Sequence, residues 1–115
     1  MSKGRPRKVA ELIQRELSDL LLREVRDPRI GMVTLTAVDV SPDLSHAKVF
    51  FTVLGEDRKE AAWRALNRAA GFLRSQLAHR IKLYAMPELR FVYDESVERG
   101  DRLSRLIDSV APGKR

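Results

Sequence analysis

Residues 27–51 read DPRIGMVTLTAVDVSPDLSHAKVFF, and this stretch decides the fold class. Because the ring of Pro28 disfavours helical geometry at Asp27, a helix arriving from the N-terminal side is expected to end there. Further along, apolar and polar residues alternate and then slip by one position near residue 37, which predicts a β-bulge. Residues 41–45 have turn composition, after which the alternation resumes. The stretch therefore predicts two antiparallel strands joined by a tight turn.

Helical spacing of apolar residues flanks this pair of strands on both sides. Over residues 9–25 apolar residues recur every three or four positions, which predicts an amphipathic helix. After the second strand, Asp57 with Glu60 resembles a capping box that opens helical spacing over residues 62–81. Gly71 lies in the middle of that segment, where a glycine costs about 1 kcal/mol relative to alanine. A kink or a break into two helices is therefore expected at Gly71.

The remaining pattern completes an α+β fold. Residues 89–93 alternate as a third strand, and residues 103–110 have the spacing of a last helix. Such an order predicts a three-stranded sheet covered by helices on one face. It is the topology of type II KH domains, whose G-x-x-G turn clamps single-stranded nucleic acid. Here Ala69, Ala70 and Gly71 stand at that junction, an Ala-x-Gly step that would bend a nearly continuous helix.

Composition limits the classes of protein to which the chain could belong. Its 115 residues, 43% of them hydrophobic, suit one domain, which we place at residues 7–110 between a flexible basic arm (1–6) and a short basic tail (111–115). Lys and Arg number 22 against 16 Asp and Glu, and the net charge of +6 favours a polyanionic partner. The absence of cysteine excludes disulfides, thiolate zinc sites and a cysteine nucleophile. No apolar run is long enough to span a bilayer, and a cytoplasmic location is expected.

Basic residues around the Ala-x-Gly step suggest how the chain would contact phosphates. Arg64 and Arg68 lie four residues apart and share a helix face, and Arg74 follows on a nearby turn. Together with helix amides freed at the kink, they predict a phosphate clamp that makes no base-specific contact. The full set of predicted RNA-binding residues is Arg5, Arg7, Lys8, Arg64, Arg68, Ala69, Ala70, Gly71, Arg74, Arg80 and Lys82.

Neither catalysis nor a cofactor is expected. His46 and His79 are the only histidines, and without cysteines they would need carboxylates brought together by folding to hold a metal. The carboxylates among residues 94–101 would satisfy free amides and the dipole at the start of a helix, a better explanation than a metal-dependent nuclease. Trp63 and Phe72 fall beside the main apolar stripe, and we expect them to be mainly buried and outside the site.

Three stretches in register resemble the bacterial ribosome-binding factor A family. They are residues 27–51, the Ala-x-Gly step at residues 69–71, and PELRFVYDESVERGDRL at residues 87–103. The resemblance covers nearly the whole chain. It implies a cytoplasmic, non-enzymatic, monomeric RNA-binding protein that joins the immature small (30S) ribosomal subunit, assists late maturation and 5′-end processing of 16S rRNA, and matters most in the cold. The implied partners are small-subunit ribosomal RNA, free 30S subunits and other assembly factors, GTPases among them.

Two other functions fit parts of the sequence. A generic KH-like RNA or DNA regulator acting off the ribosome has the same topology, but the missing G-x-x-G argues against it. A peripheral membrane protein, or one that binds a partner helix, would use the first amphipathic helix. The polar face of that helix mixes Glu11, Glu16 and Asp19 with Arg15, which disfavours anionic lipid.

Overall fold

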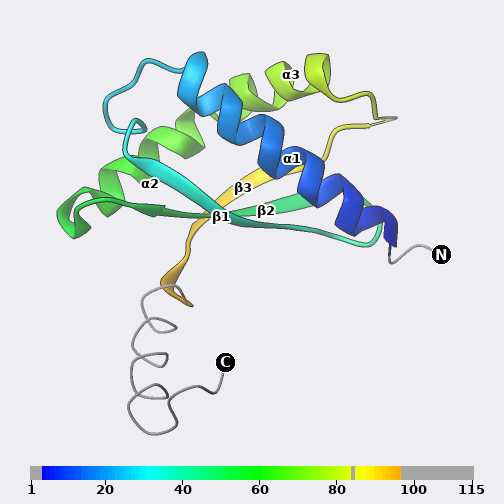
Figure 1. Ribbon diagram of the computed structural model, residues 1–115, viewed down its shortest axis with the longest axis horizontal. Helices are drawn as coiled ribbons and strands as arrows, with labels where there is room; N and C mark the ends of the chain where they lie inside the picture. Colours follow the sequence, from blue (N-terminus) through cyan, green and yellow to red (C-terminus); the bar gives the residue numbers. More distant parts are fainter. Residues whose placement is uncertain (1–3, 84, 97–115) are drawn as a thin grey trace, which may run out of the picture.

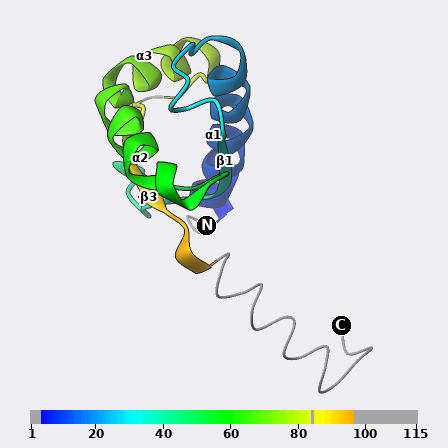
Figure 2. The ribbon, with the colours of Figure 1, turned by 90° about the vertical axis from the view of Figure 1, so that its left-hand side faces the viewer.

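The computed structural model describes residues 4–83 and 85–96, which form an α+β fold of two layers (Figure 1). A three-stranded sheet makes one layer, and the helices make the other (Figure 2). The order of elements is the KH-like order predicted from the sequence. The elements are α1 (Gly4–Arg23), β1 (Val33–Val40), β2 (His46–Val53), a 3₁₀ turn (Glu56–Arg58), α2 (Lys59–Arg68), α3 (Ala70–Arg80) and β3 (Glu88–Tyr93).

The sheet has the order β1-β2-β3, with β2 in the centre. β1 pairs with β2 antiparallel, and the register shifts between Leu35 and Ala37, which confirms the predicted hairpin and its bulge. The Thr36 hydroxyl, at the bulge, donates a hydrogen bond to the Asp94 carboxylate. β3 lies on the other side of β2 and runs parallel to it. Asp94 directly follows β3, so its hydrogen bond with Thr36 connects the end of β3 to β1, on the far side of the sheet.

The core lies between the sheet and the helices. Alternate residues of the central strand β2, Ala47, Val49 and Phe51, are fully buried, as a period of two requires for a strand with one face against helices. The Phe51 and Tyr93 rings meet edge to face, with centroids 5.5 Å apart. The helices contribute fully buried side chains at three- and four-residue spacing: Ile13, Leu17, Leu20, Leu66, Leu73 and Leu77.

The first helix differs from the prediction at both ends. It begins at Gly4, so Arg5 lies in its first turn instead of on the expected arm (1–6), and Arg7 and Lys8 lie in the helix ahead of the apolar spacing that starts at residue 9. It ends at Arg23, before Asp27. Asp27 builds a local turn in which its carboxylate accepts a hydrogen bond from the Arg29 amide at 3.0 Å, and its carbonyl accepts the amides of residues 30 and 31. This turn replaces the last helical turn that the apolar spacing predicted.

The predicted capping box is wrong. Asp57 lies inside the 3₁₀ turn, and Arg58 occupies the N-cap of α2 without a side-chain capping bond. The chain reaches α2 through Gly55, whose φ of +94° favours glycine, and the Arg58 amide bonds to the Gly55 carbonyl at 3.0 Å. The tight turn therefore takes the place of the side-chain cap.

The break between helices falls at Ala69 rather than at Gly71. Ala69 is both the C-cap of α2 and the N-cap of α3, with φ −88° and ψ 0°. Gly71 lies within α3, and a Cβ built there would meet nothing within 4 Å. Close packing therefore does not require glycine at this position. The expected helix at residues 103–110 and the tail at 111–115 lie outside the described residues.

No helix within the described ranges is both long and apolar enough to cross a bilayer.

The packing of α1 yields a matched pair of stability predictions. Leu17 is 0% exposed whereas Leu22, on the same helix, is 80% exposed. Truncating a buried leucine leaves a cavity, so Leu17→Ala is expected to lower the free energy of unfolding by roughly 2–5 kcal/mol. Leu22→Ala is expected to change it by less than about 0.5 kcal/mol. Urea unfolding of both variants measures the difference, and equal losses would show that α1 packs through another face.

Candidate nucleic-acid interface

Helix α2 runs beside β3, the edge strand, and side chains from the helix hold it there. Near the start of α2, the Lys59 ammonium lies 4.4 Å from the centroid of the Tyr93 ring. One turn later, the Trp63 indole Nε1 donates a hydrogen bond to the Phe91 carbonyl at 3.0 Å. These contacts hold the first half of α2 against the second half of β3.

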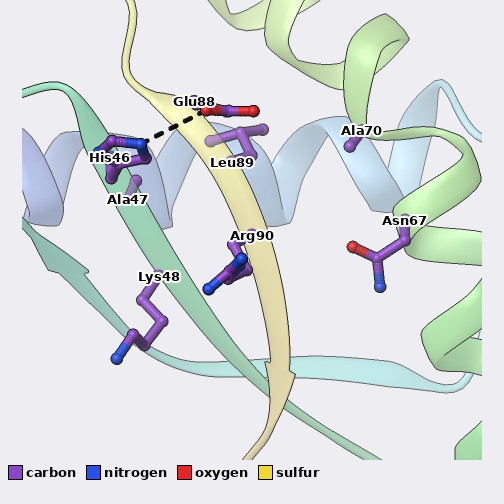
Figure 3. A pocket seen from close by; sticks show the side chains of 8 residues that line it. All are labelled: His46, Ala47, Lys48, Asn67, Ala70, Glu88, Leu89 and Arg90. Atoms are coloured by element: carbon purple, nitrogen blue, oxygen red, sulfur yellow. Dashed lines mark ion pairs between the residues drawn. The ribbon is translucent and has the colours of Figure 1, made fainter.

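Where those contacts end, a groove of about 460 Å³ opens beside the kink (Figure 3). One wall comes from the helices and the other from β2 and β3. In Figure 3 the Lys48 and Arg90 side chains extend from adjacent strands on the same side of the sheet, while Asn67 and Ala70 lie across from them. The lining residues are His46, Ala47, Lys48, Asn67, Ala70, Glu88, Leu89 and Arg90.

The groove presents two cations with no internal partner. Lys48 and Arg90 are register partners on parallel strands, and both are exposed. Their side chains make no ion pair or hydrogen bond with any residue in the described ranges. At the start of the same strands, His46 Nε2 lies 3.5 Å from Glu88 Oε1. The groove therefore offers an anion the positive charges of Lys48 and Arg90, beside the Glu88 carboxylate that lies near His46.

The kink supplies a second feature that suits phosphate. The first amides of a helix have no partner within it, and the alanine at the N-cap of α3 makes no side-chain capping bond to them. Ala70 lines the groove, and Gly71 beside it is exposed. Free amides at a helix start bind anions readily. Of the predicted Ala-x-Gly residues, the structure brings Ala70 to the groove.

Two predicted arginines join separate segments of the protein, and Arg80 is the first. Arg80 Nη1 donates to Glu16 Oε1 at 3.3 Å and to Asp19 Oδ2 at 2.9 Å, which joins α3 to α1. The pKa of Asp19 is lowered, first by the hydrogen bond from Arg80 and then by that from Arg23. Arg80 is thus part of the contact between helices and does not line the groove.

Arg74 has a similar internal role. Its Nη2 donates to the Met86 carbonyl at 2.7 Å and its Nε to the Pro87 carbonyl at 3.2 Å, which holds the chain just before β3. Arg74 also lines a second cavity, of about 360 Å³, together with Arg5 and the β1-β2 turn. In that turn, hydrogen bonds from Ser41 and Ser45 lower the pKa of Asp43 to about 2. The structure therefore brings Arg5 and Arg74 together, away from the groove.

The other predicted basic residues lie on exposed surfaces outside the groove. Arg64 forms an ion pair with Glu60 one turn earlier in α2, at 3.0 Å. Arg68 faces the loop after α1. There the pKa of Asp27 is lowered chiefly by its hydrogen bond from Arg29, with a smaller contribution from the charge of Arg68. Arg7, Lys8 and Lys82 are exposed.

Trp63 and Phe72 do not follow the expectation of burial, because they are 44% and 51% exposed. The helix faces that meet the core carry Ala62, Leu66 and Leu73. Trp63 lies one position from that stripe and covers the edge of β3 instead of entering the core. The spacing of apolar residues alone does not show whether a tryptophan beside the stripe is buried in the core or half exposed.

Sequence reasoning missed Lys48, Arg90 and Asn67. The alternation of each strand does indicate that Lys48 and Arg90 point away from the core. Their adjacency, however, follows from the parallel pairing of β2 with β3, which joins residues about forty positions apart in the chain.

The described residues hold no cluster of three or more His, Asp or Glu side chains able to bind a metal ion. His46 pairs with Glu88, and His79 Nδ1 lies 2.9 Å from the Ser75 carbonyl on its own helix.

Comparison with known proteins gives consistent matches along the chain. A family model described as ribosome-binding factor A matches residues 5–107. Ribosome-binding factor A of Nitrosospira multiformis is 54% identical over 113 residues, covering 97% of this chain and 90% of the relative. That of Nitrosomonas eutropha is 57% identical over 108 residues, covering 93% and 92%.

Solved structures agree. The crystal structure of ribosome-binding factor A from Thermus thermophilus is 31% identical with a TM-score of 0.69, covering 76% of this chain and 94% of that one. A homology model of the Thermus thermophilus factor, as fitted into the cryo-electron microscopy map of a 30S complex with that factor, matches with 31% identity and a TM-score of 0.64, covering 75% and 91%.

The Arg80 contact yields a test of its internal role. Arg80→Gln is expected to lower the thermal midpoint, whereas Lys82→Gln, an exposed neighbour, is expected to leave it unchanged. Because folding lowers the pKa of Asp19 from 3.8, the stabilisation is present above that value and is lost as the pH falls below it. The difference between wild type and Arg80→Gln should therefore shrink as the pH is lowered from 7 to 3. Melting curves across this range measure it, and a constant difference would contradict an ionic role for the contact.

Proposed function

The chain belongs to the ribosome-binding factor A family, and on that premise we propose that it binds the small (30S) ribosomal subunit as a maturation factor. In this proposal it is a cytoplasmic RNA-binding protein without catalytic activity. It assists late maturation and 5′-end processing of 16S rRNA, with its greatest effect in the cold. The complex that the Thermus thermophilus relative forms with the 30S subunit supports the choice of partner.

The observation that carries the RNA-binding part is the groove beside the kink. A phosphate placed there would meet the free amides at the start of α3 and the charges of Lys48 and Arg90. The surrounding exposed cations extend the same electrostatic surface. We propose that Arg5, Arg7, Lys8, Arg64, Arg68 and Lys82 contribute peripheral phosphate contacts, while Arg74 and Arg80 position the elements that form the groove.

Binding alone is sufficient for a role in maturation. A protein that binds one conformation of an RNA better than the alternatives raises the population of that conformation by its differential affinity. The ligand proposed for this groove is single-stranded RNA, because the unstacked bases of a single strand are accessible to a protein groove and those inside a duplex are not. The factor would thus stabilise one local arrangement of small-subunit RNA and leave when that arrangement is no longer available.

Sedimentation tests the choice of partner. The purified protein is expected to comigrate with free small subunits and not with complete ribosomes. If about six phosphates are contacted, a plot of log affinity against log salt concentration should have a slope between about −4 and −5. Gradient sedimentation and equilibrium binding at several salt concentrations measure both quantities. Comigration only with other RNA would favour a KH-like regulator acting off the ribosome, and a flat salt dependence would contradict the electrostatic surface.

Two double variants separate the groove from the outer face of α2. Lys48→Gln with Arg90→Gln and Arg64→Gln with Arg68→Gln each remove two exposed positive charges. The groove pair is expected to cost more affinity for small subunits and to reduce the salt slope by about 1.5 to 2, as two lost phosphate contacts would. Equilibrium binding measures the two slopes, and melting curves confirm that each variant is folded. A larger loss from the α2 pair would place the RNA on the outer face of that helix.

A further inference from the structure

A second groove, of about 200 Å³, lies between α1 and β1, and we call it the α1–β1 groove. Its walls are the last turns of α1, the loop that follows and the first residues of β1 (Figure 1). The sheet order β1-β2-β3 places it at the edge opposite β3. The lining residues are Ser18, Leu21, Leu22, Ile30, Gly31, Val33, Thr34 and Leu35.

Large apolar side chains are exposed at this end of the molecule. Leu22, which lines the groove, is 80% exposed, and Met32, which lies between two lining residues, is 43% exposed. Leu54 is 70% exposed, and its amide bonds to the Met32 carbonyl at 3.3 Å. These three are among the five large apolar side chains that are exposed in the described part of the chain. Such a concentration of exposed apolar residues marks a surface that another molecule covers.

The edge of β1 beside the groove is poorly suited to an added strand. The Leu35 carbonyl accepts a hydrogen bond from the Gln14 amide nitrogen at 3.5 Å, and the Val33 amide bonds to the Ile30 carbonyl at 2.9 Å. An extended segment docked here would therefore leave backbone groups of its own without partners. A helix satisfies those groups internally and binds a groove through its side chains. The α1–β1 groove thus suits a helix better than a strand.

Most carboxylates near the groove are already bound by arginines. Arg80 Nη1 lies 3.3 Å from the Glu16 carboxylate and 2.9 Å from that of Asp19, which directs both acids toward α3. In the loop after α1, Asp27 forms an ion pair with Arg29 at 2.8 Å. The negative charge of these acids is therefore compensated within the protein.

The side of α1 that borders the groove carries positive charge. Arg15, Ser18 and Leu22 follow one another at three- and four-residue steps, so they lie along one side of the helix. Arg15 is exposed, with its Nε 3.8 Å from the carboxylate of the next residue, while Glu11 lies about two turns before Ser18. Arg26, in the loop after α1, is exposed and makes no ion pair or hydrogen bond within residues 4–83 and 85–96. This surface attracts an acidic partner, whereas a second copy with its net charge of +6 is repelled.

We propose that the α1–β1 groove docks an acidic amphipathic helix of a partner protein. One large apolar side chain of that helix would be seated against Leu22, and its carboxylates would meet Arg15 and Arg26. The inference goes beyond the proposed function, because it assigns a protein partner to a surface that shares no residue with the RNA groove. Since the two grooves lie at opposite edges of the sheet, RNA and the partner helix can be bound together.

The experiment titrates the full ¹⁵N-labelled chain with a blocked peptide of three Leu-Glu-Ala-Leu-Leu-Ala-Glu repeats, followed by NMR. This probe is long enough to form an amphipathic helix, and its polar side is acidic. The amide signals of Leu22, Gly31 and Val33 are expected to shift, while those of Ala70 and Leu89 in the RNA groove stay in place. A matched peptide with Lys in place of Glu is expected to bind at least about tenfold more weakly.

Matched variants test the two contacts. Leu22→Ala is expected to weaken binding of the acidic peptide at least about fivefold, because a leucine contact is lost. Phe72→Ala, which removes an exposed apolar side chain of α3, should leave that affinity unchanged.

The charge contact has its own pair of variants. Arg15→Gln with Arg26→Gln should weaken binding and reduce its dependence on salt, whereas Arg64→Gln with Arg68→Gln removes the same charge from α2 and should not.

Each contrary outcome has a distinct meaning. Equal binding of the acidic and basic peptides, or full affinity in folded Leu22→Ala, would overturn the inference. Shifts of the Gly31 signal caused by raising the protein concentration alone would make a second copy the occupant, and shifts caused by hexaadenylate would make it RNA. If the acidic peptide does not bind while the protein still sediments with small subunits, the inference fails and the proposed function stands. If the peptide binds as expected but the protein does not sediment with them, the docking surface stands and the proposed function fails.

Discussion

The parallel pairing of β3 with β2 is the constraint on which the rest of the structure depends. Parallel neighbours cannot be joined by a tight turn and need a long crossover, which residues 54–87 supply as α2 and α3. Both crossover helices must then pack on the face that α1 also covers, because that is where the fully buried side chains of β2 point. The three fully buried residues of β2 thus lie against the helices, and a shift of one residue in β2 would turn them to solvent.

The groove is a consequence of how the crossover is divided. A continuous helix over residues 59–80 would run straight past the sheet. The break at Ala69 instead lets α2 follow the edge of β3 while α3 turns back over the core to meet α1 through Arg80. Arg74 then ties α3 to the chain that enters β3. The cations of the groove stay available because these two arginines, and not Lys48 or Arg90, make the internal contacts.

The local pattern of apolar and turn residues was sufficient to predict most helices and strands, but it did not predict which residues form the groove. Alternation and turn composition predicted the hairpin and its bulge near residue 37, because neighbouring residues determine both. The end of α1 and the start of α2 were misplaced where the turns at Asp27 and Gly55 replaced helical ends. The groove depended on contacts between distant residues: the parallel register brought Lys48 beside Arg90, and ion pairs across helices engaged Arg80. Proximity in sequence to the Ala-x-Gly step did not indicate which arginines remain available.

The contact between Trp63 and Phe91 also bears on how the protein avoids self-association. An exposed sheet edge offers unpaired backbone groups to another chain and invites aggregation. One edge of this sheet, β1, carries the bulge between Leu35 and Ala37, and a bulged edge is a poor template for a further strand. The other edge, β3, is covered by α2 and has its Phe91 carbonyl occupied by the indole. Both edges are thereby protected from edge-to-edge pairing with the sheet of another copy. The net charge of +6 adds repulsion between copies, which favours solubility.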